Sequence, residues 1–113
     1  MGFSILIPAC NEEQSLRYIA QTVYDSFLWK TSKKRELIIC ANGCNDNTEA
    51  VAQDICNEHE NTSVIVSREK SKNKAWMSLV KESSINSNIL IFMDADIRVP
   101  SKTFELLYQE LLH

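Results

Sequence analysis

Glycine is scarce in this 113-residue chain, which contains only Gly2 and Gly43. Phosphate loops of the Walker and dinucleotide-binding types need several glycines close together, so the inventory excludes both. Histidine is equally rare, since His59 and His113 are the only two. The four cysteines form no CxxC pair and complete no zinc-ligand spacing with these histidines. We therefore interpret the cysteines as reduced thiols of a cytoplasmic protein.

The sequence also lacks long apolar runs and a strong excess of either charge. No run is long enough to span a bilayer, and the first residues lack a basic region and are interrupted by Pro8, unlike a signal peptide. The net charge is −3 with acids and bases interspersed, which predicts neither a nucleic-acid surface nor an acidic tail. The length suits one globular domain. We expect a single soluble domain over residues 1–113.

Short apolar runs alternate with amphipathic segments along the chain. Residues 3–8, 36–41, 63–67 and 88–93 are apolar nearly throughout and are predicted strands. A segment with helical spacing follows each of them. Because the strands are apolar on both sides, they predict a parallel sheet with helices on both faces, an α/β fold in the order βαβαβαβα. The helix positions that we expect to be buried are Leu16, Ile19, Ala20, Val23, Phe27, Val51, Ala52, Ile55, Trp76, Leu79, Val80, Phe104, Leu107, Tyr108 and Leu111.

The segments that connect the predicted strands and helices give weaker predictions. Asn11 is predicted to cap the first helix and Thr48 the second, because short polar side chains suit that position. The polar and basic segment 30–35 is predicted to be a solvated loop.

Polar residues gather where three predicted strands end, at residues 8–11, 42–47 and 94–96. The carboxyl ends of parallel strands meet at one edge of the sheet, and ligands bind there. Asp94 and Asp96 lie on the same side of an extended chain, where they could share one hard cation. The alternative is that both acids cap the next helix or face solvent.

Three segments resemble motifs of family 2 glycosyltransferases. Residues 5–13, ILIPACNEE, resemble the opening strand and Pro-x-Tyr-Asn-Glu loop of that family. Residues 42–48, NGCNDNT, resemble its Asp-Asp-Gly-Ser-x-Asp-x-Thr turn, and residues 92–96, FMDAD, its Asp-x-Asp metal motif. The resemblance implies a Rossmann-like GT-A fold that holds a nucleotide-diphospho-sugar at the carboxyl side of the sheet. It also implies that Mg²⁺ or Mn²⁺ binds at the Asp-x-Asp motif.

The resemblance assigns roles to particular residues. Asp96 would be the direct metal ligand, and Asp94 would contact the ribose or support the metal. Arg68 and Lys74 would meet the base or the diphosphate, although a solvated basic loop is the alternative for both. The full nucleotide-sugar set that the resemblance implies is Pro8, Cys10, Asn11, Glu12, Asn42, Arg68, Lys74 and Asp94.

The sequence also departs from the family pattern. Cys10 stands where a Tyr commonly packs on the base, and Ala41 and Asn42 replace the two aspartates of the turn. The second aspartate usually accepts a hydrogen bond from the base, whereas Asn42 offers a donor and an acceptor without charge. Our hypothesis is that base selectivity is altered or relaxed and that a uridine donor should not be assumed. A plain turn role for Asn42 is the alternative.

The family's catalytic domain continues well past the Asp-x-Asp helix. We therefore expect residues 1–113 to be the donor-binding half of a truncated GT-A domain, with the general base beyond residue 113. The reaction implied is metal-dependent, inverting transfer of a sugar to a hydroxyl of a polysaccharide, lipid carrier or small molecule, with membrane association through missing segments or the acceptor. The alternative is a non-catalytic nucleotide-binding or self-associating module, and an uncovered sheet edge would favour a homodimer.

Overall fold

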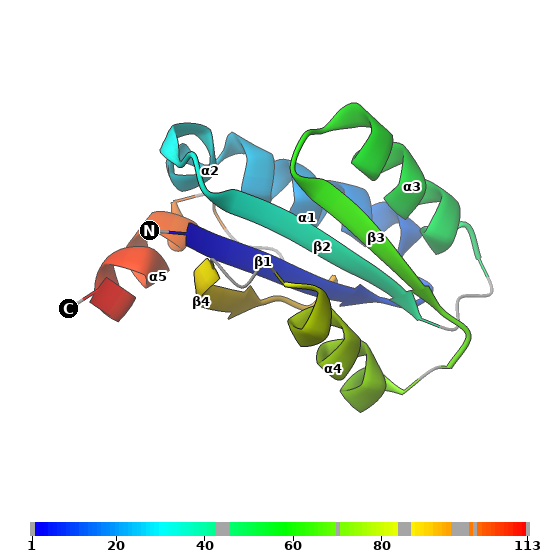
Figure 1. Ribbon diagram of the computed structural model, residues 1–113. Helices are drawn as coiled ribbons and strands as arrows, with labels where there is room; N and C mark the ends of the chain where they lie inside the picture. The colour runs from blue at the N-terminus through cyan, green and yellow to red at the C-terminus, as the bar shows by residue number, and fades with distance from the viewer. Residues whose placement is uncertain are drawn as a thin grey trace.

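A computed structural model describes residues 2–42, 46–69, 71–83, 87–95, 100 and 102–112. Within these residues, strands and helices alternate along the chain (Figure 1). The elements are β1 (Gly2–Ala9), α1 (Glu13–Asp25), α2 (Phe27–Thr31), β2 (Arg35–Asn42), α3 (Thr48–Glu58), β3 (Thr62–Ser67), α4 (Lys72–Glu82), β4 (Ser87–Phe92) and α5 (Thr103–Leu112). Apart from the short additional helix α2, this order matches the prediction.

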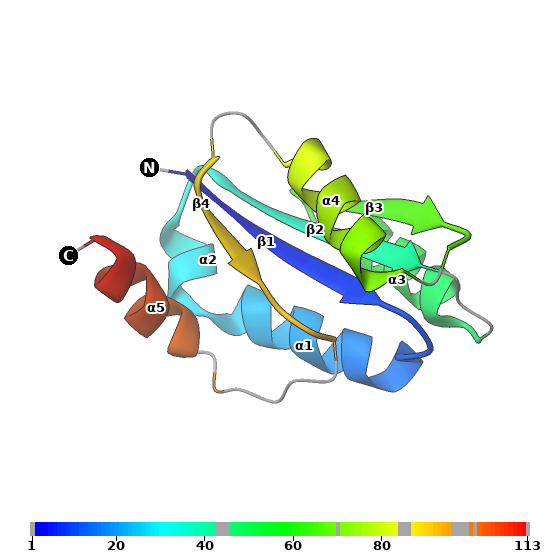
Figure 2. The same cartoon turned by 90° about the horizontal axis from the view of Figure 1, so that it is seen from below.

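The four strands form one parallel sheet in the order β3-β2-β1-β4. The chain moves outward from β1 to β3 and then returns to place β4 on the other side of β1. Because crossover connections are right-handed, this reversal puts α4 on the face opposite α1 and α3 (Figure 2). The predicted parallel α/β sheet with helices on both faces is confirmed. In sheets of this kind, ligands bind at the carboxyl ends near the reversal.

Alternate residues of each strand supply two separate cores. Phe3, Ile5 and Ile7 of β1 pack beneath α1 and α3 in the larger core. Leu6 belongs to the smaller core beneath α4, together with Leu79 of that helix. Full burial of one such side chain contributes about 1.5–3 kcal/mol. Burial on both faces explains why the strands are apolar throughout.

The first helix ends earlier than predicted, at Ser26. The Ser26 hydroxyl donates a hydrogen bond to the Val23 carbonyl (2.6 Å) and accepts one from the Trp29 backbone N–H (3.1 Å). It therefore ends α1 and caps α2, and the helical period restarts. Phe27, predicted to be buried, is 70% exposed, and Trp29 is the residue that enters the core, at 5% exposure. Val80 and Leu107 are also exposed, contrary to the prediction.

The segment 30–35 is not a simple solvated loop. Its first two residues belong to α2, and Arg35 begins β2. The Arg35 guanidinium lies 4.9 Å from the centroid of the Trp29 ring and donates hydrogen bonds to the carbonyls of Trp29 and Ser32. A cation over an aromatic face contributes about 0.5–2 kcal/mol. Arg35 thus fastens α2 to the first residues of the strand.

A second aromatic contact joins the far ends of α1 and α3. The Tyr24 ring stacks on His59 at 3.7 Å between centroids, and its hydroxyl forms a 2.6 Å hydrogen bond with the Thr62 hydroxyl. Burial raises the pKa of Tyr24 to about 12. Since Thr62 begins β3, this contact lies at the amino edge of the sheet.

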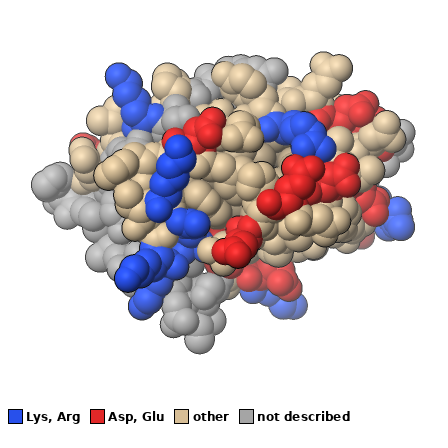
Figure 3. Space-filling view, turned by 90° about the horizontal axis from the view of Figure 1, so that it is seen from above, with Lys and Arg blue, Asp and Glu red and all other residues tan. Residues whose placement is uncertain are grey.

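The helix-covered face above the larger core carries charges of both signs, interspersed over its surface (Figure 3). Arg17 of α1 lies 3.6 Å from Asp54 and 3.5 Å from Glu58, both on α3. These side chains are about half exposed, so each pair contributes at most about 1 kcal/mol. No helix in the described part of the chain is both long and apolar enough to cross a membrane.

Candidate functional site

The carboxyl edge of the sheet brings together residues from four strands. Pro8 pairs in register with Cys40, and Asn42 pairs with Ser67. Strand alternation puts Asn42 on the same face as Cys40, which is the face covered by α4. The structure therefore places Pro8 and Asn42, two of the predicted strand-end residues, at one edge and on the side of the sheet where α4 begins.

The loops after β1 and β2 are joined through Thr48. This residue is fully buried, and its hydroxyl accepts a hydrogen bond from the Glu12 backbone N–H (2.9 Å). The same hydroxyl donates to Asp46 Oδ1 at 2.5 Å, and the Thr48 backbone N–H donates to that oxygen at 3.0 Å. These bonds from Thr48, and a further one from the Glu13 backbone N–H, lower the pKa of Asp46. The Asp46 carboxylate thus links the loop after β1 with the loop after β2.

Thr48 differs from the helix cap that was predicted. Asn47 occupies the N-cap position, and Thr48 is the first helical residue. The sequence reasoning missed the positioning role of Asp46 and Thr48. The sequence could have indicated this role, because the two residues form the Asp-x-Thr part of the turn motif quoted above.

Asn11 is likewise not the cap of its helix. Glu12 holds the N-cap position of α1 and makes no side-chain capping bond. Asn11 instead has a backbone φ of +55°, in the left-handed region that Asn tolerates better than most residues. It therefore turns the chain from β1 into α1. Its exposed side chain stands at the carboxyl edge, as the predicted site requires.

Asn42 is a buried polar residue of the site whose side-chain carbonyl lacks a hydrogen-bond partner among the described residues. It is only 5% exposed, and its Oδ1 atom has no hydrogen-bond partner in the described structure. A buried carbonyl left unpaired costs about 1–3 kcal/mol. A donor supplied by a ligand would remove that cost. This observation favours a ligand-binding role for Asn42 over a plain turn role.

Arg68 and Lys74 lie where α4 begins, at the same edge. Ser71 caps the helix by accepting a hydrogen bond from the Lys74 backbone N–H at 3.3 Å. The Lys74 ammonium forms an ion pair with Glu69, while Arg68 is exposed. The N-terminus of α4 and the exposed Arg68 thus lie at the same edge, and Lys74 has a carboxylate partner.

Asp94 lies two residues after the end of β4, at the reversal of the sheet. The Met93 backbone N–H donates to the Leu6 carbonyl at 3.0 Å, so pairing with β1 continues one residue past the strand. Met93 and Ala95 are buried in the core beneath α1, which leaves half-buried Asp94 on the opposite side. Asp96 and residues 43–45 lie outside the described residues. In the described part of the chain, no three His, Cys, Asp or Glu residues form a cluster able to hold a metal.

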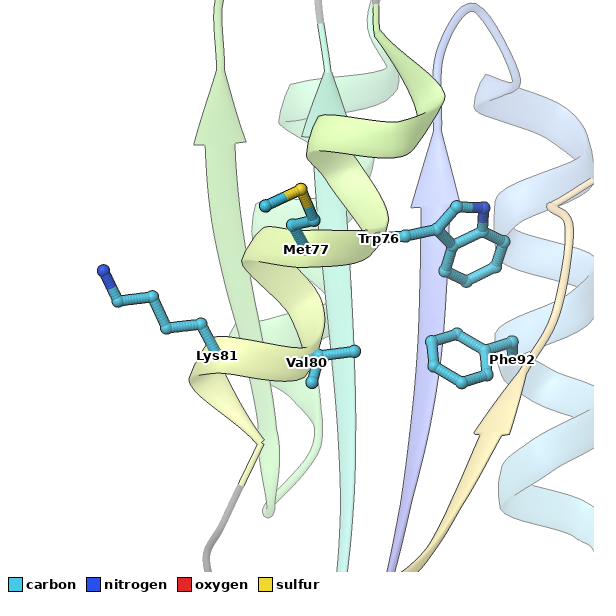
Figure 4. A pocket seen from close by; sticks show the side chains of 5 residues that line it. All are labelled: Trp76, Met77, Val80, Lys81 and Phe92. Carbon is cyan, nitrogen blue, oxygen red and sulfur yellow. The ribbon is translucent and has the colours of Figure 1, made fainter.

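A groove of about 710 Å³ lies beside this edge, between α4 and β4. Trp76 and Phe92 form one wall, with their ring centroids 4.7 Å apart, and Met77 and Val80 form another part. Figure 4 shows the Lys81 side chain extending away from the two rings. The lining is apolar, which suits a hydrocarbon group and not a diphosphate. We therefore do not assign the groove to the strand-end site.

Comparison with known proteins agrees with this arrangement. None of the curated proteins matches the sequence. The model of the family described as "Glycosyl transferase family 2" matches residues 4–113. The chain therefore belongs to the family 2 glycosyltransferases.

Solved structures show the same fold. A structure of S. aureus TarS 1-349 superposes with a TM-score of 0.80 at 18% identity, covering 96% of this chain and 32% of that solved chain. Glucosyl-3-phosphoglycerate synthase from Mycobacterium tuberculosis, solved with Mn²⁺, UDP and phosphoglyceric acid, gives 0.74 at 25% identity, covering 98% of this chain and 39% of that enzyme. The resemblance to GT-A glycosyltransferases is confirmed. This chain spans well under half of those proteins' length.

Proposed function

We propose that the carboxyl edge binds a nucleotide-diphospho-sugar, and that the complete protein transfers its sugar to an acceptor hydroxyl with inversion. The observation that carries the proposal is the buried Asn42 at the end of β2, whose side-chain carbonyl has no hydrogen-bond partner among the described residues. Around it stand two loops held together by Thr48 and the N-terminus of α4. Family membership and the UDP bound in a related synthase support the same ligand class.

A divalent cation, Mg²⁺ or Mn²⁺, fits the residues of this edge. Mg²⁺ is commonly held by one or two carboxylates together with substrate phosphates, so a cluster of three protein ligands is not required. Asp94 is a half-buried carboxylate at the reversal of the sheet, and we propose that it holds the cation together with Asp96. When bound, the cation would stabilise the negative charge of the departing diphosphate.

The chain's own residues would bind and orient the donor. Asp46 and Thr48 keep the loops after β1 and β2 in one arrangement, so the donor meets a preformed edge. Pro8 and Cys10 would lie along the nucleotide, and Arg68 beside its phosphates. A general base and the acceptor site are proposed to lie in parts of the protein outside this chain, because the chain covers only about a third of the related structures.

Titration calorimetry tests this proposal directly. Nucleoside diphosphates would be titrated with and without Mn²⁺ into the wild type, Asp94→Ala, Asp96→Ala and the control Asp25→Ala. Asp25 ends α1 at the amino edge, where its carboxylate accepts a hydrogen bond from the exposed Gln21 side chain. We expect Mn²⁺-dependent binding by wild type and control, weakened at least about tenfold in the other two variants. Absence of binding by every diphosphate would overturn the proposal.

A second candidate is a module that binds a nucleotide without transferring sugar, and that pairs with a second copy. In the described structure β4 pairs only with β1, so its outer edge offers unpaired backbone groups. Light scattering at micromolar concentration tests the homodimer. A sugar-release assay on the complete protein, with a panel of nucleotide-diphospho-sugars, separates a binding module from a transferase, because only the latter releases sugar.

A further inference from the structure

The surface of α4 that faces away from the sheet has an apolar half and a basic half. Ala75 and Leu79 are buried against the sheet, which places Met77, 71% exposed, near the centre of this outer surface. The apolar groove described above lies on one side of Met77. On the other side, Lys74 and Lys81 flank a second hollow of about 300 Å³. Met77 and Lys81 line both hollows, so the two lie next to each other.

The apolar half is exposed although its side chains are large. Val80 and Phe92 are both exposed, and Phe92 packs edge-on against the half-buried Trp76. Figure 4 shows the Trp76 and Phe92 rings together on one side of α4 and the Lys81 ammonium on the other. A contiguous exposed apolar patch rimmed by polar groups is typical of a surface that binds a partner.

The segment that carries this surface is also the basic part of an acidic chain. Residues 68–82 contain five Lys or Arg and two Glu, whereas the whole chain has 12 basic and 15 acidic residues. Of the two acids, Glu69 pairs with Lys74 through exposed side chains, and such a pair is weak and readily exchanged for another anion. Glu82 is the last residue of α4 and is exposed. Clusters of about four to eight basic residues on an amphipathic helix are typical of binding to anionic lipids.

We propose that the outer surface of α4 docks onto a lipid bilayer that contains anionic headgroups. Met77 and Phe92 would enter the boundary between headgroups and acyl chains, and Trp76 would lie at the same depth. Lys74 and Lys81 would reach the phosphates with their long side chains. A bilayer matches both halves of the surface, because it offers hydrocarbon and negative charge side by side. An acidic polypeptide would match the lysines and leave the groove unfilled.

Docking through α4 would also orient the molecule. This helix begins at the carboxyl edge of the sheet, where the donor site is proposed. The bilayer would therefore hold that edge beside the membrane surface. The inference goes beyond the proposed donor binding and does not depend on it.

Vesicle flotation tests the inference. The wild type would be mixed with vesicles of phosphatidylcholine alone, or of phosphatidylcholine with about one third phosphatidylglycerol. We expect binding to the anionic vesicles at low salt, and binding at least about tenfold weaker to phosphatidylcholine alone. Added salt should weaken the binding to anionic vesicles, because it screens exposed charges. Tryptophan fluorescence should shift to shorter wavelength on binding through Trp76, since Trp29 is already buried.

Two variants and two matched controls locate the contact. Met77→Ser and Lys81→Glu should each weaken binding to the anionic vesicles at least about fivefold. Phe27→Ser removes an apolar side chain that is equally exposed, at 70%, and Lys30→Glu reverses a charge in the last turn of α2, as Lys81→Glu does in α4. Because α2 packs on the opposite face of the sheet, both controls should bind within about twofold of wild type. All four side chains are exposed, and circular dichroism would verify that each variant folds.

Three outcomes would overturn the inference. The first is that the wild type does not bind the anionic vesicles. The second is that the two controls lose as much binding as the two α4 variants, which would show that net charge or overall hydrophobicity governs binding. The third is retention of the wild type on immobilised polyglutamate without binding to vesicles, which would assign the surface to an acidic polypeptide. Since no nucleotide is present in this test, its failure leaves the proposed function untouched.

Discussion

Thr48 accepts a hydrogen bond from the backbone N–H of Glu12, 36 residues earlier in the chain, while fully buried. This contact connects the loop that follows β1 with the start of α3. It makes the geometry of the strand-end edge depend on one hydroxyl group. The Asp46 carboxylate holds that hydroxyl in place, and both residues act as positioning residues for the proposed site.

Replacing Thr48 with Val should remove this connection without changing the side-chain shape. The Glu12 N–H and the Asp46 carboxylate would each lose a partner, and we expect the free energy of unfolding to fall by about 1–3 kcal/mol. Urea titration followed by circular dichroism measures this change. Thr48→Ser keeps the hydroxyl and should lose much less stability. Equal losses in the two variants would contradict the role given to the hydrogen bonds.

Asp46 should make the stability of the protein sensitive to acid. Its pKa is lowered in the folded state, chiefly by the Thr48 hydroxyl, so its stabilising effect is complete above the unfolded pKa of about 3.9. That effect is lost as the pH falls through the lower folded pKa. We expect Asp46→Asn to be less stable than wild type at pH 6, and the difference to shrink as the pH falls below the unfolded pKa of about 3.9. Urea midpoints measured across this range, with Asp25→Asn as the control, check the expectation.

Tyr24 should produce the opposite dependence at alkaline pH. Its pKa rises from about 10 to about 12 on folding because the phenol is buried. The resulting stability is complete below pH 10 and is lost as the pH rises through 12. Absorbance titration of wild type and Tyr24→Phe should show that the missing phenol ionises near pH 12. A difference curve centred near pH 10 would show that Tyr24 is solvated.

The break at Ser26 predicts that two neighbouring aromatic residues differ sharply. Phe27 is largely exposed, so Phe27→Ala should change stability by less than about 0.5 kcal/mol. Trp29 is buried and packs edge-on against Tyr24 at 5.3 Å, so Trp29→Ala should cost about 3–5 kcal/mol. Thermal unfolding of both variants tests this contrast. A large loss of stability in Phe27→Ala would show that Phe27 is buried, as the helical spacing predicted, and would contradict the break at Ser26.

Much of the fold could be predicted because burial on two faces leaves a direct mark on the sequence. Ile38 and Ile39 face different cores, and only a doubly covered strand needs both to be apolar. The exposure of Phe27 could not be predicted in the same way. The helical spacing of apolar residues continues through Phe27. The break arises because the Ser26 hydroxyl donates to the Val23 carbonyl, which ends α1, and accepts from the Trp29 N–H, which begins α2.

The candidate site was predictable in position but not in its internal connections. Asn42 was identified from its place after a strand, and the structure adds that its side-chain carbonyl is buried and has no hydrogen-bond partner within the part of the chain that is described. The bond from Glu12 to Thr48 joins residues far apart in sequence, which local patterns do not encode. The metal pair remains a prediction, because Asp94 is placed at the edge and Asp96 lies outside the described residues.

The order of the strands has a consequence for how the molecule is made. β1 is synthesised first, yet it is an inner strand whose second neighbour, β4, begins at Ser87. Until that segment leaves the ribosome, one side of β1 has unpaired backbone groups and half of the proposed site does not exist. Such late, long-range pairing slows folding and prolongs the exposure of apolar strand edges. We therefore expect the strands of this chain to be most exposed to incorrect pairing before β4 has been synthesised.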